Sequence, residues 1–575
     1  MRRASQGRTF FFASSILFSA TGCTTTIPAL SGTVALPRTR PELTGYSETS
    51  HYADVRKFLD SLRVLRAPLA FGSIGKTTEG RDIPYVIASR PLVSTPAEAA
   101  RLGRPIVYVQ GNIHAGEVEG KEALLALLRD LTFSTRPNAL DSIVLIAVPI
   151  YNADGNERFA SQSVNRTEQN GPEMVGTRAS AQGFDLNRDY VKAEAPETRA
   201  SLAMFTKWDP DVFVDLHTTD GSFHGYALTY SPSLSPAAVF GGVYARDSLL
   251  PVLRERMRTR HGLGVFDYGN FLSDERAGVA ESTAKEGWAT YDSRPRFGTN
   301  YYGIRGRVAI LGEAYSHDPL ERRIASTYAF VNEILSLVAE QGAAIRSLSA
   351  RSAVQPLVWG RSPDSLQMVA IRSELIATPQ MIDVIREDLE QTGDSSLTQP
   401  GLPRGLRRTG HYKSIRMPVF DRFTSTLDRI PPAAYILAPR NTAAVALLRL
   451  HGIRVERSDT AWSARGESFV IDSIVTASRA FQGHHEVRLK GRWERGLQTL
   501  SAGSFIVSTA QPLGALVVYL LEPESDDGLT TWNFFDSQLR QGEHFPVRQI
   551  LGLGRRGRGT AASSSSASRP QPLPN

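Results

Sequence analysis

The 575-residue chain is nearly free of cysteine, since Cys23 is the only one. A single thiol excludes an intramolecular disulfide, so no such cross-link stabilises the fold. The apolar run near the N-terminus, FFFASSILFSA at 10–20, is too short to span a bilayer. The sequence also lacks internal repeats, which excludes a solenoid or another repeat architecture.

The excess positive charge of the chain is concentrated at its two ends. The formal net charge is +7 at pH 7, and much of it comes from arginines at the extreme N-terminus and in the C-terminal tail. Charge outside the folded part does not indicate a nucleic-acid-binding surface, so we expect no nucleic-acid partner. The arginines concerned are Arg2, Arg3, Arg8, Arg555, Arg556, Arg558 and Arg569.

The N-terminus has the features of an export signal. A basic start is followed by the apolar run and then by ATGC at 20–23. This tetrapeptide resembles a bacterial lipobox, in which cleavage before the cysteine leaves it free for lipidation, although Ala20 stands where leucine is more usual. We predict an exported protein of the periplasm or cell envelope, tethered to a membrane through a lipidated Cys23. The alternative is a plain secretory signal that is cut nearby.

The length of the chain favours two folded domains, because a single hydrophobic core stops growing at about 250–300 residues. We predict a signal peptide with a lipobox at 1–23 and a Thr/Pro/Ser-rich linker at 24–45. An α/β domain follows at 46–345 and a smaller mixed α/β domain at 355–553. The Ser/Pro/Arg-rich segment 554–575 is predicted to be a disordered tail.

In the first predicted domain, continuous apolar runs alternate with helical patterns. Runs of this kind are typical of strands buried on both faces of a sheet. Their alternation with helices predicts an α/β fold with a mixed, mostly parallel sheet and helices on both faces. The runs are PIVYVQ (105–110), SIVLIAVPIY (142–151), DVFVDLHT (211–218) and GRVAILGE (306–313), and the helical candidates are 119–131 and 194–207.

The second predicted domain has apolar segments of both kinds. They include AAYILAP at 433–439, an Ala/Leu-rich helical stretch that ends near Gly452, and ALVVYLLEP at 515–523. Asp526 and Asp527 then stand in a polar loop beside aromatic residues. We interpret that loop as a solvated turn, with an interface to the first domain as the alternative.

Side chains that suit metal binding or proton transfer follow three of the predicted strands. His114 and Glu117 follow the run PIVYVQ, whereas His217 and Glu313 lie at the ends of two later runs. Ligands of open α/β sheets bind beyond the carboxyl ends of the strands, so these segments would converge on one rim. A catalytic zinc takes three ligands from His, Glu or Asp, and a further carboxylate serves as general base. Taken singly, each residue has a simpler interpretation as a solvated or packed polar side chain.

Four short motifs follow one another along the chain, and NADG at 152–155 stands among them. The chain thereby resembles the M14 family of zinc carboxypeptidases over roughly residues 50–345. The family has the same elements in the same order, and its N-P-D-G turn matches NADG except that Ala153 replaces proline. Several independent motifs in one order make the match specific. The four motifs are HAGE (114–117), DLNR (185–188), DLH (215–217) and LGE (311–313).

The resemblance implies one zinc ion as the cofactor and a role for each matched residue. His114, Glu117 and His217 are similar to the family's zinc ligands. Asp185 is similar to the carboxylate that holds the first histidine by its other ring nitrogen and fixes its orientation. Glu313 is similar to the general base, which takes a proton from the zinc-activated water and passes it to the leaving amine.

Two neighbouring residues resemble the family's substrate clamp. Asn187 and Arg188 match the Asn-Arg pair that holds the terminal carboxylate of the substrate. A guanidinium suits this role because it can grip a carboxylate with two parallel hydrogen bonds. The resemblance therefore implies hydrolysis of C-terminal peptide bonds.

Two further roles of the family have more than one candidate here. Arg178 is our choice for the arginine that polarises the scissile carbonyl, with Arg166 as the rival. Tyr291 is our choice for the mobile tyrosine that covers the substrate, with Tyr301 and Tyr302 as rivals. Ordinary half-buried packing is the alternative for each tyrosine.

Two more histidines lie close to the matched residues in the sequence. His224 is left out of the ligand set, because an extra protein ligand would be unusual in a three-ligand zinc site. His317 comes soon after Glu313, and we expect it to be a solvated loop residue, with a place in the pocket wall as the alternative.

The sequence as a whole predicts an exported zinc metallocarboxypeptidase whose substrate is a peptide or a cell-wall peptide. One alternative keeps the zinc and changes the reaction, to removal of an acyl group from an amino acid or cleavage of a peptidoglycan stem. Another, from a different class, is a peptide-binding protein without catalysis. The ligands, the base and the clamp are all present, which argues against the last interpretation.

Overall fold

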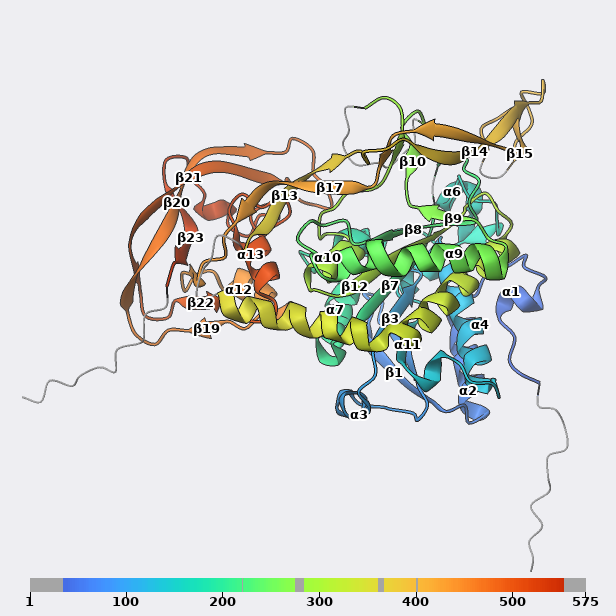
Figure 1. Ribbon diagram of the computed structural model, residues 1–575, viewed down its shortest axis with the longest axis horizontal. Helices are drawn as coiled ribbons and strands as arrows, with labels where there is room; N and C mark the ends of the chain where they lie inside the picture. The colour runs from blue at the N-terminus through green and yellow to red at the C-terminus, as the bar shows by residue number, and fades with distance from the viewer. Residues whose placement is uncertain (1–34, 220, 275–283, 360–366, 400–401, 553–575) are drawn as a thin grey trace, which may run out of the picture. The chain divides into compact units, whose positions relative to one another are not determined.

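The computed structural model describes residues 35–219, 221–274, 284–359, 367–399 and 402–552 (Figure 1). The predicted signal peptide with Cys23, residues 24–34 of the predicted linker and the predicted tail 554–575 lie outside the described residues. The chain separates into two units, Met1–Leu36 and Pro37–Asn575. Within the described residues, no helix combines the length and the apolar character that a membrane span requires.

A sheet of eight strands lies at the centre of the first predicted domain. In sheet order the strands are β1 (Leu69–Lys76), β2 (Asp82–Ala88), β4 (Val144–Val148), β3 (Ile106–Gly111), β7 (Val212–Thr218), β12 (Val308–Ala314), β8 (Leu228–Pro232) and β9 (Val265–Asp267). β4, β3, β7 and β12 are parallel neighbours in the middle, and β8 and β9 are also parallel. β1, β2 and β8 supply the antiparallel pairs. The predicted mixed, mostly parallel sheet is confirmed.

Helices cover both faces of this sheet, as predicted. One face carries α4 (Glu119–Phe133), α9 (Leu250–His261) and α11 (Leu320–Trp359), and the other carries α7 (Pro196–Trp208) and α10 (Gly298–Ile304). The middle strand β3 shows why two cores form. Val107 and Val109 belong to the core under α4, whereas Tyr108 belongs to the core under α7, because successive side chains of a strand point to opposite faces.

Antiparallel strands dominate the C-terminal part of the chain. A six-stranded sheet has the order β19 (Glu456–Arg457), β22 (Phe505–Ser508), β18 (Ala434–Leu437), β23 (His544–Ile550), β20 (Trp462–Thr476) and β21 (Val487–Leu500). Two ladders join β13 (Val369–Ile376) to β17 (Arg422–Arg429) and β14 (Ile382–Gln391) to β15 (Leu406–Met417). Two helices, α12 (Thr442–Leu450) and α13 (Gly514–Leu521), complete a region of mixed α and β structure.

The other elements are short or lie at the margin of the sheets. They are α1 (Arg40–Leu43), α2 (Tyr52–Val64), α3 (Pro96–Leu102), η1 (Ala139–Asp141), α5 (Ala153–Glu157), β5 (Ala160–Ser161), α6 (Gln162–Asn165), β6 (Met174–Val175), η2 (Leu186–Arg188), α8 (Gly241–Tyr244), η3 (Ala245–Leu249), β10 (Asn270–Phe271), β11 (Trp288–Ala289), β16 (Val419–Phe420) and η4 (Asp536–Gln538). β16 pairs in parallel with β11, which links the C-terminal part to the first predicted domain.

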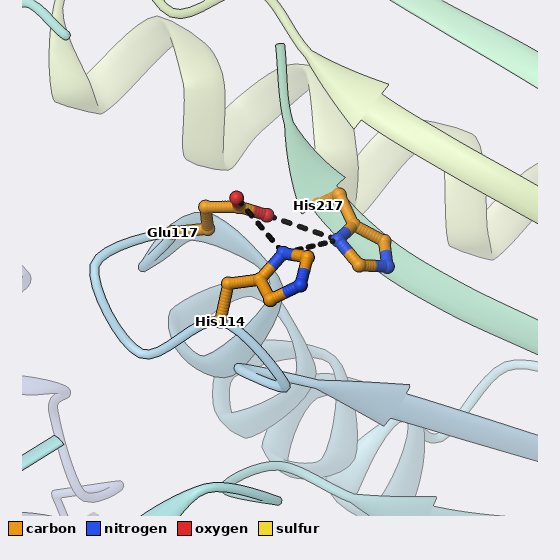
Figure 2. Close-up of side chains that lie close together, drawn as sticks. All are labelled: His114, Glu117 and His217. Carbon is orange, nitrogen blue, oxygen red and sulfur yellow. Dashed lines mark hydrogen bonds and ion pairs between the residues drawn. The ribbon is translucent and has the colours of Figure 1, made fainter. Parts of the chain in front are cut away.

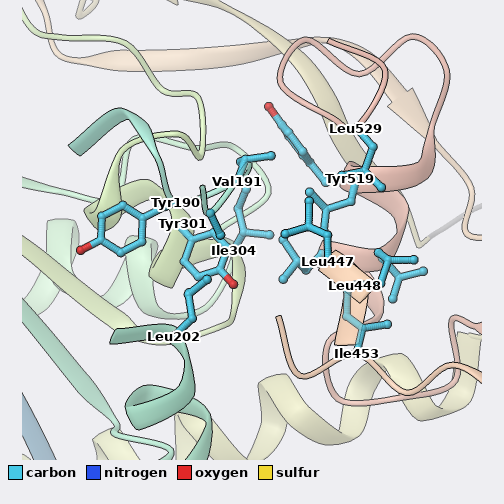
Figure 3. Packing of buried hydrophobic residues seen from close by; sticks show 14 of the residues in the cluster. Tyr190, Val191, Leu202, Tyr301, Ile304, Leu447, Leu448, Ile453, Tyr519 and Leu529 are labelled. Carbon is cyan, nitrogen blue, oxygen red and sulfur yellow. The ribbon is translucent and has the colours of Figure 1, made fainter. Parts of the chain in front are cut away.

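One apolar cluster contains side chains of both predicted domains (Figure 3). α11 also crosses the predicted boundary, since it ends at Trp359, whose side chain belongs to the same cluster. The domain boundaries stay predictions, but this packing shows that the C-terminal residues share a core with α7 and α10. The cluster includes Val191, Leu202, Tyr301 and Ile304 from the first predicted domain and Leu447, Leu448, Ile453, Tyr519 and Leu529 from the second.

Candidate active site

Three neighbouring strands bring the predicted site together. β3, β7 and β12 are parallel, so their carboxyl ends lie at one edge of the sheet. In this register Glu313 of β12 stands beside His217 of β7. The turn that carries His114 and Glu117 follows β3 and leads into α4. All four side chains therefore start from the same edge.

The turn after β3 is tight because small residues allow close packing. Glu117 donates its backbone N–H to the His114 carbonyl at 3.0 Å. At Gly116, a Cβ atom would lie 2.7 Å from Cγ of Arg166, which leaves no room for a side chain. Asn112 adopts a positive φ of 65°, and its amide donates to the Glu117 carbonyl at 3.3 Å. These bonds hold His114 and Glu117 in one orientation.

His114, Glu117 and His217 bring three donor groups to one point (Figure 2). The two imidazole Nδ1 atoms are 3.2 Å apart, and Glu117 approaches them at 3.0 Å through Oε1 and at 2.9 Å through Oε2. Donor atoms of all three residues lie within 4.8 Å of one another, and each residue is 3% exposed. Two imidazole nitrogens and a carboxylate oxygen are a donor set that suits a catalytic zinc.

The electrostatics of this cluster favour a cation between the donors. Burial opposes the charge of Glu117, but His114 and Arg166 beside it hold its pKa well below the usual range. Burial also opposes the charge of His217, yet Asp215 and Glu117 raise its pKa well above the ordinary value. A proton and a metal ion compete for such a place, because metal ligands must be deprotonated.

Each histidine is held from its far side by a carboxylate. His114 Nε2 lies 2.9 Å from Asp185 Oδ1, and His217 Nε2 lies 3.1 Å from Asp215 Oδ2. Partners of this kind orient the ring and decide which nitrogen faces a metal. The sequence predicts Asp185 for this place, whereas sequence reasoning missed Asp215. Its signal is its position two residues before His217 on β7, which puts both residues on one face of the strand.

Arg178 and Arg166 both reach Glu117, but from different surroundings. Arg178 donates to Glu117 Oε1 at 3.1 Å and to Asp185 Oδ2 at 3.0 Å, and its side chain is 36% exposed. Arg166 is buried, and it donates to Glu117 Oε1 at 3.2 Å and to the carbonyls of residues 218–219 at 3.1 and 3.0 Å. Of the two side chains, Arg178 is therefore the more exposed, and it lines the cavity described below.

Asn187 and Arg188 lie in η2, next to the donor cluster. Asn187 Oδ1 accepts a hydrogen bond from the Gly298 N–H at 2.9 Å, and its Nδ2 lies 3.5 Å from His217 Nε2. The guanidinium carbon of Arg188 lies 3.8 Å from the centre of the Phe297 ring, and Nη1 donates to the Asn187 carbonyl at 2.8 Å. Burial lowers the pKa of Arg188.

The three candidate tyrosines lie in different places. Tyr291 belongs to the wall of the cavity that also contains the donor cluster, and burial raises the pKa of its phenol. Tyr301 is buried in the core, with its hydroxyl 2.7 Å from Nδ1 of His451. Tyr302 is buried there too, and its ring stacks on Phe205 at a centre-to-centre distance of 3.8 Å. Both rivals are core residues and do not line the cavity.

A cavity of about 640 Å³ joins these groups. Its wall contains the three donor residues, Glu313, Arg178 and the Asn187–Arg188 pair. Sequence reasoning missed the other side of this wall, which comes from the C-terminal part of the chain and carries no local motif. The residues concerned are Arg372, Ser373, Glu374, Leu375, Phe420, Phe423, Thr426, Arg488, Ser525 and Asp526.

Residues 57–239 match the zinc carboxypeptidase family, Peptidase M14. This part of the chain is similar to that family. The chain is similar to Carboxypeptidase 2 of Trichophyton rubrum, with 23% identity over 490 residues that cover 83% of this chain and 81% of that protein. Carboxypeptidase D of Mus musculus is 28% identical over 202 residues, which cover 31% of this chain and 14% of that protein.

The solved structures that the chain resembles include a metallo-carboxypeptidase from Burkholderia cenocepacia. The TM-score is 0.37 and the identity 17%, with 51% of this chain and 70% of that chain covered. The match to the zinc carboxypeptidase model and the carboxypeptidase relatives indicate that the chain is a zinc hydrolase.

Neither of the two further histidines is solvated. His317 was expected in a solvated loop, but it is 2% exposed, and its ring stacks on Phe223 with the centres 4.0 Å apart. Burial lowers its pKa to about 3. His224 is buried as well and stays outside the donor cluster, and burial lowers its pKa to about 3. The expectation for His317 is wrong because an aromatic neighbour covers the ring.

The loop at Asp526 and Asp527 is also not the expected solvated turn. Asp527 is fully buried and accepts a hydrogen bond from Nε of Arg296 at 2.9 Å. Asp526 lines the cavity and accepts a hydrogen bond from the Tyr519 hydroxyl. Burial raises the pKa of Asp526 to about 6. The alternative interpretation, an interface with the first domain, is correct, because Arg296 supplies the positive partner.

Proposed function

We propose that the chain is an exported zinc metallocarboxypeptidase that hydrolyses the C-terminal bond of peptides. The observation that carries this proposal is the shared cavity. It contains a three-residue donor set, a carboxylate outside that set and an Asn-Arg pair. The sequence of the first 23 residues supports export, since it has the charge and apolar pattern of a signal peptide that ends at Cys23.

The donor residues fit a zinc ion. His114, Glu117 and His217 supply two nitrogens and an oxygen from buried side chains, and Asp185 and Asp215 orient the two rings. Bound there, zinc would polarise the scissile carbonyl and lower the pKa of a water molecule.

Glu313 and Arg178 are the proposed catalytic residues. Glu313 lines the cavity beside His217 and is not a member of the donor set. Its carboxylate takes the proton of the attacking water and delivers it to the nitrogen of the leaving amine. The guanidinium of Arg178 stabilises the negative charge that develops on the carbonyl oxygen, because it lies in the cavity and is not wholly buried.

Asn187 and Arg188 make the proposed cleavage exopeptidic. Both line the cavity beside the donor set. An amide and a guanidinium can hold the two oxygens of a terminal carboxylate, and this places the last peptide bond over the reacting groups. A peptide whose C-terminus is amidated lacks the charge that Arg188 recognises.

The test is hydrolysis of a peptide with a free C-terminus, measured with a chelator and after the return of zinc. Glu313→Gln is expected to lower kcat by about 10²–10⁴-fold with zinc still bound, since it removes the proton acceptor and keeps the shape. Glu374→Gln is the matched control, because this exposed carboxylate lines the same cavity from β13. Full activity in Glu313→Gln, or activity that the chelator leaves intact, contradicts the proposal.

A further inference from the structure

Asp527 forms a buried bridge between the C-terminal part and the candidate site. Its Oδ2 accepts the backbone N–H of Arg296 at 2.7 Å, and its Oδ1 accepts Nε of the same residue at 2.9 Å. Trp532 Nε1 donates to Oδ1 at 3.0 Å, and Glu486 accepts Nη1 of Arg296 at 2.6 Å. Asp527 therefore fixes both the backbone and the side chain of Arg296.

The two residues after Arg296 hold the proposed carboxylate clamp. The Phe297 ring lies under the Arg188 guanidinium at 3.8 Å, and the Gly298 N–H donates to Asn187 Oδ1 at 2.9 Å. A shift of residues 296–298 would move both contacts at once. The position of the clamp thus depends on a segment that Asp527 anchors.

The Arg296 side chain takes its contacts from the C-terminal part of the chain. The Arg296 carbonyl accepts the N–H of Tyr190 at a long 3.4 Å. The Arg296 guanidinium carbon lies 4.7 Å from the Trp532 ring centre and 5.2 Å from that of Phe481, both residues of the C-terminal part. The strong polar contacts of the Arg296 side chain therefore come from beyond residue 480, where Glu486 and Asp527 supply them.

A second contact reaches the other end of the same motif. Gln482 Oε1 accepts the backbone N–H of Asp185 at 2.9 Å. Gln482 has a positive φ of 50°, which is uncommon for a residue with a side chain and indicates that tertiary contacts hold it. Asp185 in turn holds His114 and Arg178. The C-terminal part thus contacts Asp185 directly through Gln482 and reaches Asn187 and Arg188 through residues 296–298.

We infer that Asp527 is a positioning residue, which acts through Arg296 to aim Asn187 and Arg188 at the terminal carboxylate of the substrate. This inference rests on the proposed function, since it takes that carboxylate as the ligand. Asp527 itself does not line the cavity and touches no substrate. Its removal should weaken recognition of the free carboxylate and leave the zinc ligands and the base in place.

Binding to an inactive protein tests the inference without hydrolysis. The probe is dansyl-Gly-Phe as the free acid and as the C-terminal amide, titrated into the full chain that carries Glu313→Gln and zinc. The inference expects the acid to bind more tightly than the amide. With Asp527→Asn added, the acid should lose about tenfold in affinity, because charge-assisted bonds to the carboxylate depend on geometry, and the amide should change little. Asp472→Asn is the matched control, since Asp472 pairs with Arg492 on the exposed surface of β20 and β21.

A second variant covers the case in which Asp527→Asn unfolds because buried Arg296 loses one of its two carboxylate partners and keeps only Glu486. Arg296→Gln with Asp527→Asn removes both charges and should show the same selective loss. In the active protein, either variant should raise KM about tenfold and change kcat less than about twofold, whereas Asp527→Glu should recover part of the loss.

An unchanged preference for the acid over the amide overturns the inference. An equal loss for both peptides, or loss of zinc, also overturns it, because either indicates general disruption. Equal binding of acid and amide before Asp527 is changed would remove the clamp and the inference with it. The proposed hydrolysis is judged separately, by the activity of the chain that retains Glu313.

Discussion

The two regions of the molecule treat buried charge in different ways. Around β3, β7 and β12, charged and ionisable side chains converge, and donor atoms of His114, Glu117 and His217 lie within 4.8 Å of one another. In the C-terminal part, two buried carboxylates are each hydrogen-bonded to a partner. Asp527 binds Arg296, and Glu522 binds the Tyr435 hydroxyl. A cation can stabilise donor groups that converge on one point. A buried carboxylate that is bound to one partner instead fixes one packing arrangement.

This difference suggests that one region carries the proposed catalytic groups and the other holds the substrate and those groups in position. In the proposed function, the first region supplies the groups that meet the reacting atoms, and the second supplies one wall of the cavity and the support of the proposed clamp. Substitutions in the first should act on zinc content and kcat, and substitutions in the second on KM, specificity and stability. The predictions below test that division.

The largest effect is expected at His217. His217→Ala removes one of three proposed ligands, so bound zinc should fall well below one ion per chain. We expect kcat/KM to drop by at least about 10³-fold, because a metal supplies several kcal/mol of transition-state stabilisation. Elemental analysis and steady-state kinetics measure the two quantities. His224→Ala is the control, since this buried histidine lies outside the donor cluster, and retention of zinc in His217→Ala would contradict the ligand assignment.

Substitution of the two arginines near Glu117 should have different effects on turnover and on zinc binding. Arg178→Gln is expected to lower kcat by about 10²–10³-fold with zinc retained, as for loss of an oxyanion donor. Arg166→Gln should instead weaken zinc binding or lower the melting temperature, because Arg166 is buried against Glu117 and two backbone carbonyls. Turnover and zinc content are measured for both. The reverse pattern would make Arg166 the oxyanion arginine.

Asp215 is expected to affect activity through the affinity of the site for zinc. Asp215→Asn is expected to weaken zinc affinity by about 10–100-fold, the effect typical of a lost carboxylate behind a histidine ligand. Competition with a chelator of known affinity measures this change. Asp211→Asn is the control, because Asp211 stands at the opposite end of β7, where it accepts the Ile106 N–H at 3.0 Å. Equal zinc affinity in Asp215→Asn and the unmodified chain would show that Asp215 only packs.

The first region was predictable because its strands are continuous apolar runs. A run such as PIVYVQ fits a strand buried on both faces, and in a parallel sheet the ends of such strands meet at one edge. This rule predicts that His114, His217 and Glu313 lie close together. The position of Asp215 on the same face of β7 as His217 was also predictable, since it lies two residues away. The ligand motif alone, however, assigns no role to Asp215.

The second region was less predictable because its contacts join residues far apart in the sequence. Asp526 and Asp527 stand in a polar segment, which suggests a solvated turn, and only the approach of Arg296 explains their burial. His317 is similar, because Phe223, which covers its ring, comes from a distant segment. Periodicity describes one element at a time, so it is silent about which surfaces meet.

A smaller effect, on specificity, is expected at Phe423 of β17. Phe423 packs against the buried cluster of Tyr268, Phe297 and Leu311 and lines the cavity with them. Phe423→Ala should lower kcat/KM about tenfold for peptides that end in a large apolar residue, and change it little for those that end in alanine. Leu497→Ala, at a 70% exposed position of β21, is the control. A uniform loss over all peptides would contradict a role in specificity.

The smallest effect on activity, but a measurable one on stability, is expected at Glu522. Burial raises its pKa from 4.5 to about 7, although Tyr435 and Arg429 stand beside it. A carboxyl whose pKa is raised by folding stabilises the fold while it is protonated. That contribution is fully present below pH 4.5 and is lost as the pH rises through about 7. The unfolding free energy of the unmodified chain should therefore decline over this window.

Glu522→Gln keeps the hydrogen-bonding shape and removes the titration. Relative to the unmodified chain, the variant should gain up to about 3 kcal/mol of unfolding free energy between pH 5 and pH 8. Urea unfolding at the two pH values measures the gain. Glu494→Gln, at an exposed carboxylate of β21, should show no such trend. Activity should stay nearly constant, because Glu522 does not line the cavity. A difference in stability that is independent of pH would mean that Glu522 is ionised in the fold and that Arg429 balances the cost of its burial.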